Sequence, residues 1–94
     1  MDKFNTYKKN PSVTCTELDK GAVLLNLDNK YYYSLNETGL RIWQIVEEFH
    51  NPVEMSKRLA DEYKVDTERV KAGVFKLITE LEKEGLIVQI KGGD

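Results

Sequence analysis

The sequence predicts an α+β fold, a winged helix-turn-helix, from the order of its hydrophobic patterns. Three short stretches of strand type come first, three amphipathic helical stretches follow, and a short apolar stretch ends the series. Only Lys64 and Val65 separate the last two helical stretches, which is the tight connection typical of this fold. We therefore expect three N-terminal antiparallel strands, then three helices and a short C-terminal strand.

The length and composition predict a single domain. A chain of 94 residues is long enough to bury one core. We expect a flexible N-terminal arm over residues 1–12, because this stretch is mostly polar, then the domain over residues 13–90 and a tail over residues 91–94. The sequence has no long apolar run and no apolar signal-peptide core. We therefore expect a cytoplasmic protein with no membrane contact.

The expected hairpin is apolar on both faces. Strand patterns cover residues 13–17 and 22–27, and a third strand follows the pair Asp28-Asn29. These two residues tolerate the positive φ of a two-residue hairpin turn, which determines the register. That register places Leu24, Tyr33 and Leu35 on one face and Val23, Leu25 and Tyr32 on the other. One face should meet the core, and the other needs a different cover.

Capping residues predict where the helices begin and end. Asn36 is the expected N-cap of the first helix, Asn51 of the second and Asp66 of the third. The third helix should end at Gly85 in a Schellman motif. The last short strand then follows over residues 86–90.

Few residues could support catalysis or hold a metal. Cys15 is the only cysteine and His50 the only histidine, which excludes an internal disulfide and a zinc cage of Cys and His made by this chain alone. The sequence contains no nucleophile elbow, P-loop or zinc-protease motif. Trp43 could be a ligand platform, but its place in a wide apolar stripe favours core packing. We expect no enzyme activity, no metal and no cofactor.

A winged helix-turn-helix often binds DNA through basic residues on its third helix. In this sequence the basic residues of the third helix are accompanied by as many acidic ones, and the chain has a net charge of -2. The basic residues are Arg69, Lys71, Lys76 and Lys83, and the acidic ones are Glu68, Glu80, Glu82 and Glu84. Each phosphate contact needs an uncancelled cation. A small DNA-binding regulator is the alternative function, but we expect no nucleic-acid partner.

Phe75 and the third strand together indicate a groove for a peptide. Phe75 falls about 100° from the centre of the apolar stripe of the third helix, although by itself it could simply widen the core contact. If the second strand lies between its neighbours, the third strand has an open edge. An open edge beside an apolar groove can accept an extended peptide as an added strand.

Two stretches of the chain are informative together, GAVLLNLDNKYYYSLNETGLRIW and VDTERVKAGVFKLITELEKEGLI. The first resembles the strands and first helix, and the second the last helix, of the PqqD-like peptide chaperones, which are the recognition elements of ribosomally synthesised and post-translationally modified peptides (RiPPs). The similarity covers the chain from Val13 to Ile90. The length of the chain resembles the stand-alone leader-binding proteins of lasso-peptide biosynthesis.

The resemblance implies that this protein binds the leader segment of a ribosomally made precursor peptide and presents the precursor to modifying enzymes. In the family the leader pairs with the third strand and lies against the third helix. This implicates the backbones of Lys30, Tyr31, Tyr32, Tyr33 and Ser34, and a groove lined by Lys71, Val74, Phe75, Ile78 and Glu82. The implied partners are a separate leader peptidase and a cyclase, or a radical SAM enzyme if the pathway makes a quinone cofactor.

Overall fold

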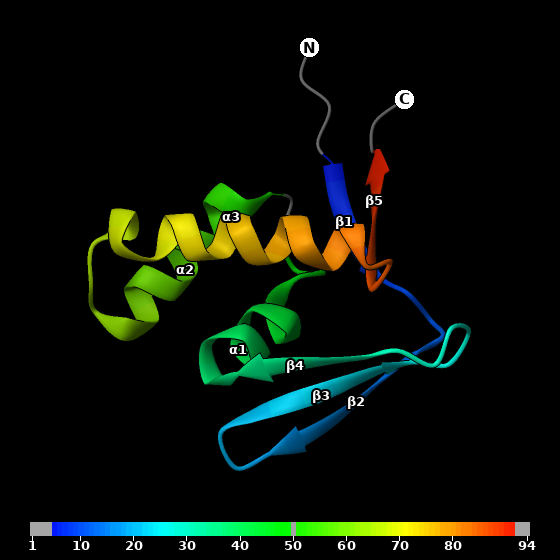
Figure 1. Cartoon of the computed structure of the whole chain (residues 1–94). Coiled ribbons are helices and arrows are strands. Elements are labelled where there is room, and N and C mark those ends of the chain that lie inside the picture. The colour runs from blue at the N-terminus through cyan, green and yellow to red at the C-terminus, as the bar shows by residue number, and fades with distance from the viewer. Residues whose placement is uncertain (1–4, 50, 92–94) are drawn as a thin grey trace.

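The computed structural model describes residues 5–49 and 51–91, and its architecture confirms the predicted α+β fold (Figure 1). The elements in chain order are β1 (Asn5–Lys9), β2 (Val13–Leu18), β3 (Gly21–Asn26), β4 (Tyr32–Asn36), α1 (Glu37–Ile45), α2 (Pro52–Tyr63), α3 (Thr67–Lys83) and β5 (Ile87–Lys91). His50 and the ends of the predicted arm and tail, residues 1–4 and 92–94, lie outside the described residues.

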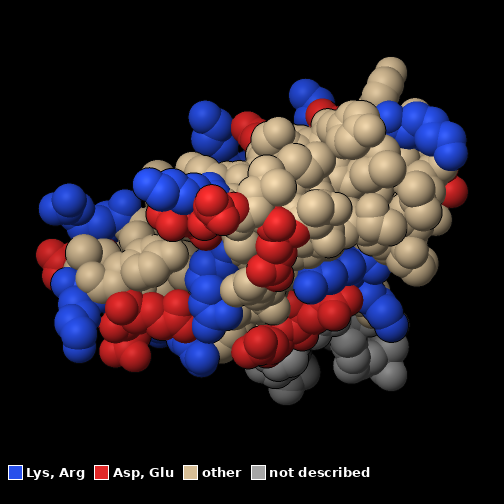
Figure 2. All heavy atoms as spheres, turned by 90° about the horizontal axis from the view of Figure 1, so that it is seen from below, with Lys and Arg blue, Asp and Glu red and all other residues tan. Residues whose placement is uncertain are grey.

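The strands β2, β3 and β4 form one antiparallel sheet with β3 in the centre. Leu24 pairs with Tyr33 and Leu25 with Tyr32, which confirms the predicted register. Leu24 belongs to the hydrophobic core, whereas Tyr32 on the opposite face is 71% exposed. Seen from below, a broad uncharged area on the side of this sheet adjoins the mixed charges of the helices (Figure 2).

The turn between β3 and β4 differs from the predicted two-residue turn. The positive φ falls on Lys30, at 68°, and not on Asp28 or Asn29. The Lys30 N–H donates to the Asn26 carbonyl over 2.7 Å and closes a wider loop. The side chain of Asn26 also accepts a bond from the Asp28 N–H, and that of Asn29 from the Tyr31 N–H. These side-chain acceptors shape the loop, and strand periodicity does not reveal them.

The strands β1 and β5 form a two-stranded antiparallel ribbon, which corrects the flexible arm predicted for residues 1–12. Asn5 pairs with Lys91, so both the predicted arm and the predicted tail contribute to the ribbon. Tyr7 is 6% exposed and belongs to the core. Tyr7 is the only large apolar residue of β1, so the sequence of this strand has no alternating pattern. Backbone pairing and the burial of one ring hold β1 in place.

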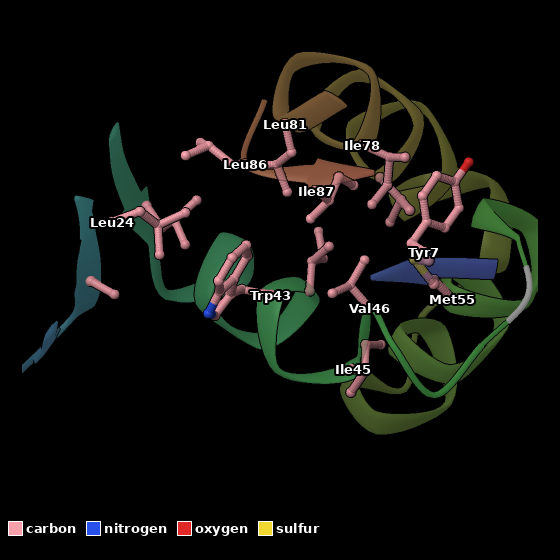
Figure 3. Packing of buried hydrophobic residues seen from close by; sticks show 14 of the residues in the cluster. Tyr7, Leu24, Trp43, Ile45, Val46, Met55, Ile78, Leu81, Leu86 and Ile87 are labelled. Atoms are coloured by element: carbon pink, nitrogen blue, oxygen red, sulfur yellow. The ribbon is translucent and has the colours of Figure 1, made fainter. Parts of the chain in front are cut away.

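The core lies between the helices, the sheet and the ribbon (Figure 3). Trp43 of α1 is 4% exposed and packs within this cluster, which confirms that it is a core residue. The Lys9 Nζ lies 4.9 Å from the centroid of the Trp43 ring, within cation–π range. The other core residues labelled in Figure 3 are Tyr7, Leu24, Ile45, Val46, Met55, Ile78, Leu81, Leu86 and Ile87. The helix α1 packs on β3, β4 and α2, and so connects the sheet to the other helices.

The helix ends largely follow the predicted capping residues. The side chains of Asn36 and Asn51 accept N–H bonds as the N-caps of α1 and α2. Asp66 is the N-cap of α3, but its side chain makes no capping bond. The helix α3 ends in the predicted Schellman motif, in which Gly85 has a φ of 75°. None of the helices in the described part of the chain is long and apolar enough to cross a membrane.

Candidate functional site

A groove with a volume of about 470 Å³ lies between β4 and α3. The two elements run in opposite directions, so the C-terminal end of β4 lies near the N-terminal end of α3 (Figure 1). Part of α1 closes the base of the groove. The lining residues are Tyr33, Ser34, Leu35 and Asn36 of β4, Thr38, Gly39 and Ile42 of α1, and Arg69, Val70, Gly73, Val74, Lys76, Leu77 and Glu80 of α3.

The outer edge of β4 has unpaired backbone groups. The Asn26 N–H donates to the Tyr31 carbonyl over 3.0 Å, so Tyr31 directs its carbonyl toward β3. Successive residues of an antiparallel strand point their N–H and C=O groups to opposite sides. Tyr33 therefore bonds β3, whereas Tyr32 and Ser34 point their backbone groups away from it. No strand within residues 5–49 and 51–91 pairs with this edge.

The base of the groove is apolar. Leu35, Ile42 and Val74 are 6%, 2% and 1% exposed. Val70 and Leu77 are partly buried and pack against the core from the α3 wall. A ligand side chain that enters here exchanges water for apolar contacts, which favours an apolar side chain.

The α3 wall carries charges of both signs in a defined order. Arg69 lies near the N-terminus of the helix, Lys76 near its middle and Glu80 nearer its C-terminus. Neither Arg69 nor Lys76 forms an ion pair with another described residue. The helix dipole has the same direction, with its positive end at the N-terminus. The groove therefore changes from basic to acidic along α3.

A hydrogen bond joins the two walls at the acidic end, where the Tyr33 hydroxyl donates to the Glu80 carboxylate. Burial, followed by this bond and by the negative charges of Glu80 and Glu84, raises the pKa of Tyr33 to about 12. Each of these effects favours the protonated phenol. The bond holds β4 and α3 at a defined spacing at this end of the groove.

The predicted strand residues do not all reach the groove. Tyr33 and Ser34 line it, and Tyr32 begins the strand at its edge. Lys30 and Tyr31 precede β4, and Tyr31 is 69% exposed. The strand edge beside the groove thus starts at Tyr32 and not at Lys30.

Of the predicted α3 residues, Val74 alone lines the groove. Residues of a helix are about 100° apart, so Phe75 and Gly73 lie on opposite sides of Val74. The groove opens on the Gly73 side. The structure does not bring the other four predicted residues, Lys71, Phe75, Ile78 and Glu82, into the lining of this groove.

The side of α3 that carries Phe75 lies toward β1. Ile78 on this side belongs to the same core cluster as Tyr7 of β1. Burial, and then the negative charge of Glu82, raises the pKa of Tyr7. Phe75 is 38% exposed and Ile78 is buried in the core. We call this side the ribbon flank of α3 (Lys71, Phe75, Ile78 and Glu82) and the opposite side the groove flank (Arg69, Gly73, Lys76 and Glu80).

Most of the groove flank is not evident from the sequence. Its charged residues look like part of a balanced helix surface, and Gly73 looks like an interruption of the apolar stripe. One signal is present, because Val70 and Leu77 extend the stripe toward Gly73. The stripe has a border on either side, however, and only the position of β4 decides which border lines the groove.

The groove has the features of a site that binds a peptide. It combines free backbone groups, an apolar base and charges at its rim. Among the described residues there is no group of three or more His, Cys, Asp or Glu side chains that could hold a metal ion. The fold and the groove together define a small peptide-binding module.

The chain belongs to the family of coenzyme PQQ synthesis protein D (PqqD), whose family model matches residues 21–87. This match confirms the PqqD-like RiPP recognition element predicted from the sequence. The solved structure of TbiB1 in complex with the TbiA(beta) leader peptide is similar, with 30% identity and a TM-score of 0.73 over 85% of this chain and 93% of that one. Lasso peptide synthetase B1 complexed with the leader peptide is also similar, with 27% identity and a TM-score of 0.74 over 87% and 96%. The comparison with curated proteins found no match.

Proposed function

We propose that this protein binds the leader segment of a ribosomally made precursor peptide in the groove between β4 and α3. The observation that carries the proposal is the unpaired outer edge of β4 beside the groove. An extended peptide can join such an edge as a new strand. Both similar solved structures are complexes with leader peptides, which supports a leader peptide as the ligand.

The leader adds to β4 as an antiparallel strand. The β2-β3-β4 sheet is antiparallel, and antiparallel pairing is slightly more stable than parallel pairing. Tyr32 and Ser34 supply the backbone donors and acceptors. Alternate side chains of the added strand point toward the base of the groove, where Leu35 and Val74 lie. Backbone bonds thus supply affinity, and the groove selects side chains.

The charges of the α3 wall favour one direction of binding. An antiparallel leader runs parallel to α3, because β4 and α3 have opposite directions. The N-terminal part of the bound segment then lies near Arg69 and Lys76, and its C-terminal part near Glu80. A segment in which acidic residues precede basic residues fits this order.

The bound precursor is presented to separate modifying enzymes, and this chain itself is not a catalyst. A leader peptidase and a cyclase are the favoured partners, because one of the similar structures is a lasso peptide synthetase B1. The PqqD family description favours the alternative partner, a radical SAM enzyme of a quinone-cofactor pathway. The cytoplasm, where precursor peptides are made, stays the predicted location.

Binding to DNA is the alternative that a winged helix-turn-helix suggests. On the described residues of the face in Figure 2, Lys and Arg are interspersed with Asp and Glu. The whole chain has a net charge of -2. Because phosphate contacts need uncancelled cations, we expect negligible affinity for duplex DNA at physiological salt.

The proposal is tested by a search of the neighbouring genes for a short precursor peptide, followed by titration of the protein into the labelled leader of that precursor, with fluorescence anisotropy as the readout. Ser34→Pro removes an N–H that points away from β3, which an edge strand tolerates. We expect this variant to remain folded and to bind the leader about tenfold or more weakly. Normal binding by folded Ser34→Pro would rule out strand addition at β4, and no binding by the unmodified protein would rule out the leader as its ligand.

Two further proline variants are controls for this test. Cys15→Pro alters the outer edge of β2, on the opposite side of the sheet. The Leu27 N–H donates to the Ser12 carbonyl, so by alternation Cys15 also points its N–H away from β3. Cys15→Pro should therefore fold and bind the leader normally. Tyr33→Pro removes an N–H that bonds β3 and should destabilise the domain.

A further inference from the structure

Gly39 of α1 and Gly73 of α3 both line the groove, but packing accounts only for Gly39. A Cβ atom built on Gly39 would lie 3.2 Å from the Leu35 Cδ2 and 3.3 Å from the Asn36 Oδ1, which is closer than ordinary contact. A Cβ atom built on Gly73 would meet no atom within 4 Å beyond its own stretch of helix. Gly73 therefore borders open space.

Backbone conformation does not account for Gly73 either. The described glycines with positive φ are Gly21 and Gly85, so Gly73 has no conformation that other residues would avoid. It lies inside α3, where alanine forms a more stable helix than glycine. A glycine here weakens the helix without relieving a clash, and the remaining explanation is a need for space.

The space beside Gly73 is apolar at its base and closed on both sides. Val70 and Leu77, about one turn before and after Gly73, are partly buried, and Val74 and Ile42 lie at the base. The other groove-flank positions carry long charged side chains. Within the described groove flank, Gly73 is thus the gap in the α3 wall.

We infer that Gly73 is a specificity-determining residue that admits one large apolar side chain of the bound peptide. The inference rests on the proposed function, because it concerns the ligand of the same groove. Alternate side chains of a strand added to β4 point toward the groove, and one of them falls beside Gly73. A long aliphatic or aromatic side chain there contacts Val70, Leu77 and the buried base. Any larger residue at position 73 occupies the same space.

The test begins with selection of a phage-displayed library of random peptides on the unmodified protein. The enriched peptides should share one position that is always large and apolar, and their binding should be lost in Ser34→Pro. One selected peptide is then titrated against Gly73→Ala and Gly73→Leu. We expect affinity to fall about tenfold or more for Gly73→Leu and less for Gly73→Ala. The melting temperature of Gly73→Ala should rise by roughly 4 °C, since only the helix is affected.

Ala72→Leu is the matched control, because Ala72 is an exposed neighbour on α3 that does not line the groove. It should bind the selected peptide normally. Replacement of the shared large residue of the peptide by alanine should restore tight binding to Gly73→Leu.

The outcomes separate this inference from the proposed function. Equal affinity of Gly73→Leu and the unmodified protein, with binding still lost in Ser34→Pro, overturns the role of Gly73 and leaves the peptide groove in place. An equal loss for Ala72→Leu and Gly73→Leu also overturns it. If the unmodified protein enriches no peptide whose binding depends on Ser34, the proposed function itself is wrong.

Discussion

The groove flank and the ribbon flank of α3 are similar in composition and differ in what they face. Both border the apolar stripe that contains Val74 and Leu81, and both carry charges of each sign. The groove flank faces the open edge of β4, whereas the ribbon flank lies toward Tyr7 of β1. Composition alone does not distinguish the two flanks. The element that faces each flank therefore decides which of them can be a binding surface.

The two flanks also differ in how apolar residues mark them. The ribbon flank has a partly exposed aromatic residue, Phe75, which looks like a ligand contact in the sequence. The groove flank has a glycine, Gly73, at the position that lies on the other side of Val74. The groove is therefore marked by a missing side chain and not by an exposed ring.

The largest expected effect is a loss of stability when a residue of the apolar stripe between the two flanks is truncated. Leu81 is 0% exposed, so Leu81→Ala should lower the free energy of unfolding by about 2 to 5 kcal/mol. Urea denaturation followed by circular dichroism measures this loss. Because Leu81 does not line the groove, the folded fraction should bind the leader normally. A loss of less than about 1 kcal/mol would mean that the stripe is not the common support of both flanks.

The next largest effect is a difference in leader affinity between variants beside the two flanks of α3. Leu77 lines the groove and Phe75 does not. Leu77→Ala should weaken leader binding by about 1 to 3 kcal/mol, as for a contact residue of an interface, whereas Phe75→Ala should leave affinity unchanged. Calorimetric titration of both variants with the leader measures the difference. Weaker binding by Phe75→Ala alone would move the peptide site to the ribbon flank.

A smaller effect concerns the bond between Tyr33 and Glu80. The pKa of Tyr33 is raised from 10.0 to about 12, so folding favours the protonated phenol. The stability from this effect is complete below pH 10 and is lost as the pH rises through about 12. The melting temperature of the unmodified protein should therefore fall more steeply over this range than that of Tyr33→Phe. Parallel curves would mean that the bond does not hold the groove walls in solution.

The smallest expected effect is a shift in the pKa of one tyrosine near each flank, Tyr7 near the ribbon flank and Tyr33 near the groove flank. Burial is the main reason that the pKa of Tyr7 is raised, and the charge of Glu82 is the second. Glu82→Gln should lower the pKa of Tyr7, which stays raised because the ring remains buried. Ultraviolet absorbance titration measures this shift. Glu80→Gln is the matched variant and should lower the pKa of Tyr33 instead. A response of Tyr7 to Glu80→Gln would contradict the separation of the flanks.

Much of the fold could be predicted because its signals are local. Asn36 and Asn51 cap helices by bonding N–H groups within three residues, and Gly85 ends α3 through its own φ. The hairpin register also follows from neighbouring residues, since the alternation of side chains leaves few ways to bury Leu24. The conformation of the loop before β4 is harder to predict from the sequence, because asparagine side chains compete with the backbone for its hydrogen bonds.

The candidate site could be predicted only in part. The strand edge follows from the order of elements, and Tyr33 and Ser34 do line the groove. Of the predicted α3 residues, Val74 alone lines the groove between β4 and α3. Helical periodicity gives the angle of each residue around the axis, but it does not tell which neighbour lies at that angle.

The sequence by itself determined the element order, the helix ends, the register of the hairpin and the faces of each element, because these depend on residues close together along the chain. Only the tertiary structure decided that β1 pairs with β5 and that β4 lies beside Gly73. Both contacts join residues that are distant in the sequence. Their geometry depends on how the helices and the sheet pack together. The periodic pattern of an element shows which of its faces is buried, but not which other element covers that face.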